Sequence, residues 1–81
     1  MKQCDIILRA MLTNKNKKWW SAKDFQYGKN FVGYEASARM SELANRFKDL
    51  IIIEKDGRFR ILSINWESKE LKNELERLNL I

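Results

Sequence analysis

The chain contains no histidine and no proline, and it has one cysteine and three glycines among its 81 residues. Without histidine it lacks the most common general base and the most common metal ligand of proteins. A single cysteine cannot form a disulfide within the chain, and without histidine it cannot build an ordinary structural zinc site. The few glycines form no phosphate-binding loop, and no carboxylates stand in a recognisable catalytic motif. We therefore expect no enzyme, no cofactor and no metal.

Long apolar runs are also missing, so no segment is expected to span a bilayer. The N-terminal stretch MKQCDIILRAMLTN has an acid within its apolar part and no small-residue cleavage site, which argues against a signal peptide. A lone cysteine fits a reducing compartment. These features predict a cytoplasmic protein with no membrane partner. Hydrophobic residues make up 44% of the chain, enough for one globular domain over residues 1–81.

Lysine and arginine outnumber aspartate and glutamate by 16 to 11, which gives a net charge of +5. Residues 1–33 carry seven basic and two acidic side chains, residues 34–63 carry six and five, and residues 64–81 carry three and four. The basic excess is therefore N-terminal. Such a charge attracts polyanions, but charge alone does not separate nucleic-acid binding from a solvated basic surface.

Two segments have the spacing of amphipathic helices, residues 3–13 and 34–48. Their apolar stripes are Cys4, Ile7, Leu8, Met11 and Leu12 in the first, and Ala36, Met40, Leu43, Ala44 and Phe47 in the second. Because Cys4 belongs to a stripe, we expect a small core residue rather than a nucleophile. The opposite face of residues 34–48 is small and polar, and no long aliphatic side chain at its centre demands burial.

A short helix is expected between these two, over residues 21–27. Ser21 is a typical N-cap, and Asp24 follows three residues later as the acid of a capping box. Trp20 and Phe25 have the spacing of a hydrophobic staple. The two adjacent tryptophans, Trp19 and Trp20, favour a short extended segment before this helix.

Residues 50–64 are predicted to form a hairpin. The run Leu50-Ile51-Ile52-Ile53 is rich in β-branched residues, and Asp56-Gly57 is a typical two-residue hairpin turn. A turn centred there places Lys55 opposite Arg58, Ile53 opposite Arg60 and Ile52 opposite Ile61. Like charges directly opposite each other are mildly unfavourable, so a hairpin selected for stability alone would avoid this pairing.

The tail, residues 66–79, is predicted to be a last helix, capped by Asn65 or Ser68. Its narrow apolar stripe consists of Leu71, Leu75 and Leu78. This stripe can pack back on residues 3–13 and complete the core of a monomer, or it can form a short coiled-coil contact in a homodimer. We favour the dimer.

The element order and the stretch "YEASARMSELANRFKDLIIIEKDGRFRI" resemble the winged helix-turn-helix superfamily of small DNA-binding domains, over residues 3–64. The resemblance implies an α+β, mainly helical fold with a three-helix core and a β-hairpin wing, to which residues 66–79 add an extra C-terminal helix. It also implies duplex DNA binding, by a transcriptional regulator or a DNA-accessory factor. Residues 34–48 would be the recognition helix, and the hairpin would be the wing.

Carried over by position, the resemblance assigns three sets of DNA contacts. Recognition helices read base edges from the major groove, and this role would fall to Tyr34, Ser37, Ala38, Arg39, Ser41 and Asn45. The wing contacts would be Lys55, Arg58 and Arg60. Phosphates would be held by Lys15, Lys17, Lys18 and Lys23, which position the protein without specifying sequence. Glu35 and Glu42 lie on or beside this face, where they would repel phosphates.

Other interpretations remain open at this point. The lysines of residues 15–18 can form a solvated loop, and the basic hairpin tip can serve to prevent edge-to-edge strand pairing. Some winged helices bind proteins instead of DNA, in which case Tyr34, Glu35, Glu42 and the leucine stripe would form an adaptor surface. A third alternative is single-strand or RNA binding, in which Trp19 and Trp20 stack on bases.

Overall fold

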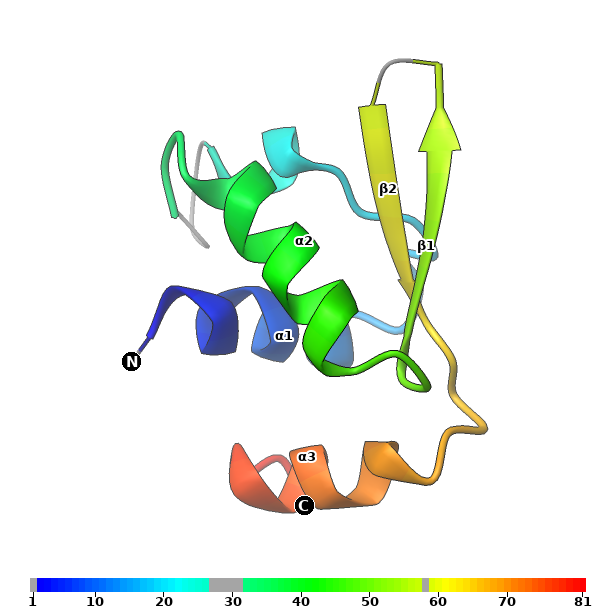
Figure 1. Ribbon diagram of the computed structural model, residues 1–81. Coiled ribbons are helices and arrows are strands. Elements are labelled where there is room, and N and C mark those ends of the chain that lie inside the picture. Colours follow the sequence, from blue (N-terminus) through cyan, green and yellow to red (C-terminus); the bar gives the residue numbers. More distant parts are fainter. Residues whose placement is uncertain (1, 27–31, 58) are drawn as a thin grey trace.

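The computed structural model describes residues 2–26, 32–57 and 59–81. Its elements follow in the order α1 (Gln3–Thr13), the 3-10 turn η1 (Ala22–Phe25), α2 (Ala36–Arg46), β1 (Ile51–Asp56), β2 (Phe59–Ile64) and α3 (Glu70–Arg77). In Figure 1, α2 crosses in front of α1, the hairpin stands along one side of α2, and α3 lies at the opposite end of the molecule from the hairpin tip. The fold is α+β, with three helices and one antiparallel hairpin among the described residues. None of these helices is long and apolar enough to cross a membrane.

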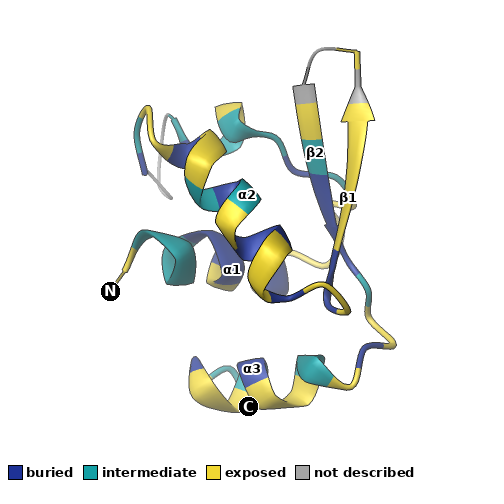
Figure 2. Ribbon diagram, viewed as in Figure 1, coloured by how far each residue is buried: buried dark blue, intermediate teal, exposed yellow. Residues whose placement is uncertain are grey.

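The core lies between α1, α2 and the base of the hairpin (Figure 2). Both predicted apolar stripes face it. On α1, Ile7, Leu8 and Met11 are fully buried, and on α2 the side chains of Met40 and Leu43 are at most 3% exposed. The bounds predicted for the first helix, 3–13, are confirmed. The spacing of three and four residues therefore identified both helix faces correctly.

The expected second helix is shorter than predicted. It is a single 3-10 turn, in which the Ser21 backbone N–H donates to the Asp24 carboxylate at 2.7 Å. The rings of Trp20 and Phe25 stack at 5.4 Å between centroids, as the staple spacing predicts. The turn ends at Phe25, and Tyr27, the last residue of the predicted helix, lies outside the described residues.

The predicted extended segment at the tryptophans is present as a single bridge between Trp20 and Leu62. The two residues exchange both backbone N–H···O=C bonds, each at 2.8 Å, so Trp20 borders β2 on the side away from β1. Successive side chains of an extended chain point to opposite faces. Trp20 accordingly lies on the core face at 5% exposure, while Trp19 is only half-buried.

The predicted hairpin register is wrong by two residues, because the loop begins one residue later than predicted. Lys55 pairs with Arg60, Ile53 with Leu62, and Ile51 with Ile64. Asp56 pairs with Phe59, so the loop begins at Gly57, whose φ of +64° is the left-handed conformation that a tight hairpin requires of its first loop residue. The observed register matches each core-facing isoleucine of β1 with an apolar partner, whereas the predicted register would set Ile53 against Arg60.

The third and fourth helices are also shorter than predicted. Residues 34–48 contain α2 only from Ala36, because Tyr34 and Glu35 form a turn after Gly33, whose φ is +93°. Residues 66–79 contain α3 only from Glu70. Asn65 Oδ1 accepts the N–H of Glu67, and Ser68 Oγ accepts the N–H of Glu70, so these two side chains hold the chain in turns before the helix begins.

Candidate nucleic-acid interface

The outer face of α2 is exposed, small and polar. Ser37, Ala38 and Asn45 are exposed, and Ser41 is half-buried on the flank nearest the hairpin. Tyr34 is 96% exposed in the turn that precedes the helix. Since none of these side chains takes part in the core, the helix can approach another molecule with this face without losing its own packing.

The hairpin joins this face through one charged side chain. The guanidinium of Arg60 donates to the hydroxyl of Ser41 across 2.7 Å. Lys55 lies directly opposite Arg60 in the sheet, and residues directly opposite share one face. Both cations are therefore on the hairpin face that borders α2. The narrow gap between the two elements is lined by Ser37, Ser41, Ile53 and Arg60, together with core residues.

Arg39 and Glu42 lie on the other flank of α2 and neutralise each other. Their guanidinium and carboxylate are 3.2 Å apart, and the thiol of Cys4 on α1 donates to the same carboxylate at 3.4 Å. Burial and the Glu42 carboxylate raise the pKa of Cys4. The pairing moves Arg39 away from the set of predicted base contacts, and it also removes much of the repulsion that Glu42 would exert on a phosphate.

Three of the four predicted phosphate lysines rest on tryptophan rings. The ammonium groups of Lys15, Lys17 and Lys18 lie 5.7, 5.2 and 5.8 Å from the ring centroids of Trp66, Trp20 and Trp19 respectively. Lys17 also pairs with Asp24 at 3.3 Å. Lys23 is exposed on η1, which lies beside the N-terminal end of α2 in Figure 1.

These lysines do not form one cluster. Lys15 lines a hollow on the α3 side of the molecule, away from the residues that join α2 to the hairpin. The predicted wing contact Arg58 lies outside the described residues. The structure thus brings together Ser37, Ser41, Lys55 and Arg60, and it separates Lys15 and Arg39 from them.

The leucine stripe of the tail is used within the chain. Leu78 is 7% exposed and belongs to the core, and Leu71 and Leu75 pack against it while remaining half-buried. The guanidinium of Arg77 on α3 is 2.8 Å from the carboxylate of Asp5 on α1. This is the monomer packing that the sequence left as an alternative, and it leaves Leu78 almost no exposed surface for a dimer contact.

Sequence reasoning missed one residue that borders this surface. Ile53 is 44% exposed at the gap between the hairpin and α2. The predicted register paired Ile53 with Arg60, so Ile53 was not recognised as part of this surface.

Comparison of the chain with protein-family models, with curated proteins and with solved structures gives no match. The site is therefore interpreted from its own residues.

Proposed function

We propose that this chain is a winged-helix protein that binds duplex DNA, with α2 as the recognition helix and the β1–β2 hairpin as the wing. The observation that carries the proposal is the 2.7 Å hydrogen bond between Arg60 and Ser41. It joins the basic part of the hairpin to the polar face of α2, so that a single ligand can contact both. Duplex DNA offers a ligand of this kind, because its major groove admits a helix and is bordered by phosphates.

The chemistry of the two parts differs. The hydroxyl of Ser37 and the amide of Asn45 can donate and accept hydrogen bonds, and the methyl group of Ala38 can contact a thymine methyl. Lys55 and Arg60 supply positive charge for contacts to phosphates, which position the protein but do not read bases. With few bidentate side chains on α2, affinity comes mainly from phosphates, and sequence preference is modest.

Two cations facing each other across the hairpin also fit this function. Lys55 and Arg60 are a like-charge pair that lowers the stability of the free hairpin. A phosphate between or beside them converts that repulsion into attraction, and it releases the counterions condensed on the DNA. In this proposal, phosphate binding accounts for the unfavourable pair.

The test is binding of random-sequence duplex DNA across a range of salt concentrations. We compare the wild-type chain with a Lys55→Gln/Arg60→Gln variant. Each lost phosphate contact lowers the slope of log K against log salt by about 0.9, so the variant should bind more weakly with a slope smaller by about 2. Both side chains are exposed, so folding should be unchanged.

The matched control is Lys69→Gln/Lys72→Gln, which removes the same charge from exposed positions at α3. It should retain most of the affinity and the slope. Equal losses in the two variants would show that only net charge matters and would refute the assignment of the hairpin. Absence of binding by the wild-type chain at low salt would refute DNA binding itself.

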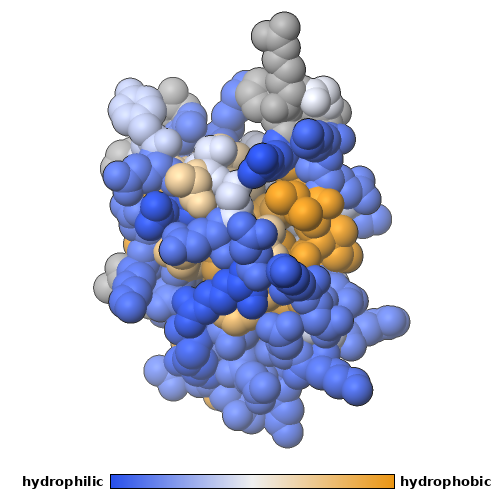
Figure 3. Space-filling view, viewed as in Figure 1, coloured by the Kyte–Doolittle hydropathy of each residue, from blue (hydrophilic) through white to orange (hydrophobic). Residues whose placement is uncertain are grey.

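A protein-binding adaptor is the second candidate, and one observation favours it. Ile52 is 41% exposed on β1, on the hairpin face opposite to that of Lys55 and Arg60. Figure 3 shows that apolar surface faces solvent on this molecule. A partner that covers the Ile52 side chain would bind independently of salt, and Ile52→Thr would weaken this binding without altering a DNA titration. Single-strand binding through both tryptophans has less support, because Trp20 is buried against Phe25.

A further inference from the structure

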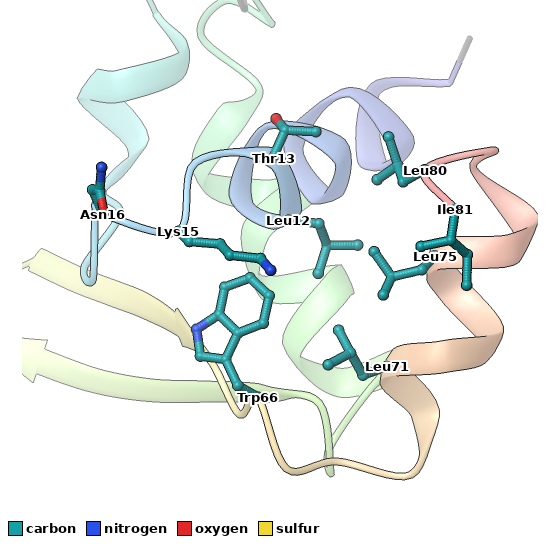
Figure 4. Close-up of a pocket in the computed structure, with 9 residues that line it drawn as sticks. All are labelled: Leu12, Thr13, Lys15, Asn16, Trp66, Leu71, Leu75, Leu80 and Ile81. Atoms are coloured by element: carbon teal, nitrogen blue, oxygen red, sulfur yellow. The ribbon is translucent and has the colours of Figure 1, made fainter.

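A second surface, unrelated to the proposed DNA interface, lies between the end of α1 and α3. It is a half-open hollow of about 460 Å³. The residues that define it are Leu12, Lys15, Trp66, Leu71, Leu75 and Ile81. In Figure 4 the side chains of Leu12, Leu71, Leu75 and Ile81 point toward a common space, and the ammonium group of Lys15 lies beside the ring of Trp66 at its border. Small-molecule sites typically have volumes of about 300–1,000 Å³ and mostly apolar walls.

The C-terminal wall of the hollow is built by a helix cap. The N–H of Leu80 donates to the carbonyl of Leu75 at 2.8 Å, and the N–H of Asn79 donates to the carbonyl of Glu76 at 3.1 Å. Asn79 has a φ of +59°. These are the bonds and the left-handed residue of a Schellman motif. The motif turns the chain back along α3, so that Leu80 and Ile81 line the hollow instead of continuing the helix.

The charge at the border of the hollow selects the kind of ligand. The ammonium of Lys15 lies 5.7 Å from the ring centroid of Trp66, and within the described parts of the chain it pairs with no carboxylate. An ammonium beside an apolar hollow complements a molecule with an anionic head and an apolar body. A cationic amphiphile would meet repulsion at the same place, and a purely polar anion would leave the leucine side chains unused.

We propose that this hollow binds a small amphipathic carboxylate, with its hydrocarbon part against Leu12, Leu71 and Leu75 and its carboxylate paired with Lys15. Burial of the hydrocarbon supplies most of the affinity, since each methylene removed from water contributes about 0.8 kcal/mol. The ion pair is partly solvated and mainly fixes orientation and head-group preference. The proposal does not depend on DNA binding, because no residue of the hollow belongs to the surface formed by α2 and the hairpin.

The experiment titrates the intact chain with decanoate, a ten-carbon carboxylate, and follows both the unfolding temperature and NMR shifts of leucine methyl groups. A ligand that binds only the folded state raises the unfolding temperature with concentration. We expect saturable shifts at Leu12, Leu71 and Leu75. Nonyltrimethylammonium has the same nine-carbon hydrocarbon chain with a cationic head, and it should bind more weakly. Acetate, which has the head group without the body, should not bind.

Two lysine variants separate a specific site from general attraction. Lys15→Gln should weaken decanoate binding by about fivefold, the upper end of what a partly exposed ion pair provides. Lys18→Gln removes the same charge from the same loop, but Lys18 lies on Trp19 outside the hollow. The dissociation constant of decanoate from the Lys18→Gln variant should therefore equal that of the wild type. Because Lys15 is exposed, its replacement should not prevent folding.

Three outcomes would overturn the proposal. Equal binding of decanoate and the cationic amphiphile would show that the charge of Lys15 selects nothing. Equal loss in Lys15→Gln and Lys18→Gln would indicate only net charge. A wild-type dimer by sedimentation, with the leucine methyl groups protected and no response to decanoate, would show that a second copy of the chain covers the hollow.

Discussion

The ion pair between Asp5 and Arg77 is the polar contact that holds α3 against α1, and its contribution to stability should depend on pH. The carboxylate of Asp5 lies 2.8 Å from the guanidinium of Arg77, and its side chain is 19% exposed. The hydrogen bond from Arg77 lowers the pKa of Asp5 in the folded chain. Asp5 also stands in the first turn of α1, where a negative charge interacts favourably with the helix dipole.

The perturbation is Asp5→Asn, which keeps the shape of the side chain and removes its charge. A partly exposed ion pair contributes up to about 1 kcal/mol, and the dipole interaction adds roughly 0.3–1 kcal/mol at the surface. We expect the variant to lose about 1 kcal/mol at pH 7. In a domain of this size that loss corresponds to a decrease of about 4–8 °C in the unfolding temperature. Urea unfolding followed by circular dichroism measures the loss in unfolding free energy, and thermal unfolding measures the change in temperature.

The sign of the pH dependence follows from the lowered pKa. An unfolded aspartate titrates near pKa ~3.9, and the folded carboxyl titrates below that value. Asp5 therefore contributes its full stability above the pKa of the unfolded state, and it loses this contribution as the pH falls through the folded pKa. The difference between wild type and Asp5→Asn should be largest at pH 7 and smaller at pH 2. The control Glu67→Gln, at an exposed residue, should show little difference at either pH. An equal difference at both pH values for Asp5→Asn would refute the role of charge.

Two further substitutions test local features of the fold. Gly57→Ala should destabilise the chain by roughly 1–2 kcal/mol in urea unfolding, because a φ of +64° is strained for any residue with a Cβ. No atom lies within 4 Å of the Cβ that the substitution adds. A larger loss would therefore contradict a purely backbone cause. Trp20→Ala should cost about 3–5 kcal/mol as a buried aromatic residue, whereas Trp19→Ala, at a half-buried position, should cost much less. Similar losses at the two tryptophans would contradict their assignment to opposite faces of the sheet.

The helices and the core could be predicted from the sequence because their signals are local. The spacing of Ile7, Leu8 and Met11, and of Met40 and Leu43, fixes a helix face without knowledge of any partner. The pair Trp20 and Phe25 was predictable for the same reason, since the staple spans only five residues. Helix ends were less predictable. Helix α3 begins later than predicted, at Glu70. The hydroxyl of Ser68 donates a hydrogen bond to Asp49, a residue of the α2–β1 connection, at 2.6 Å, and this bond holds Ser68 outside the helix.

The site was only partly predictable, because it depends on contacts between distant residues. The register of the hairpin changes by two residues when the loop begins at Gly57, and this change determines whether Lys55 faces Arg58 or Arg60. Likewise, the sequence places Arg39 and Glu42 on one helix, but the position of Cys4 beside them depends on how α1 crosses α2. The leucine stripe was interpreted as a dimer contact, since its spacing fits that use as well as the packing against the monomer core that the structure shows.

The two proposed surfaces lie at opposite ends of the molecule, and the chain connects them through the α2–β1 corner. Asp49 in this corner accepts a hydrogen bond from Ser68 at 2.6 Å, and its carbonyl accepts one from Asn65 at 3.1 Å. These bonds, with the Asp5–Arg77 pair, are polar and near the surface, so α3 is held more weakly than α1 and α2 hold each other. Local opening begins where buried apolar contacts are fewest. A carboxylate that fills the hollow adds such contacts between α1 and α3, and it should therefore protect the amide hydrogens of α3 from exchange more than those of α2.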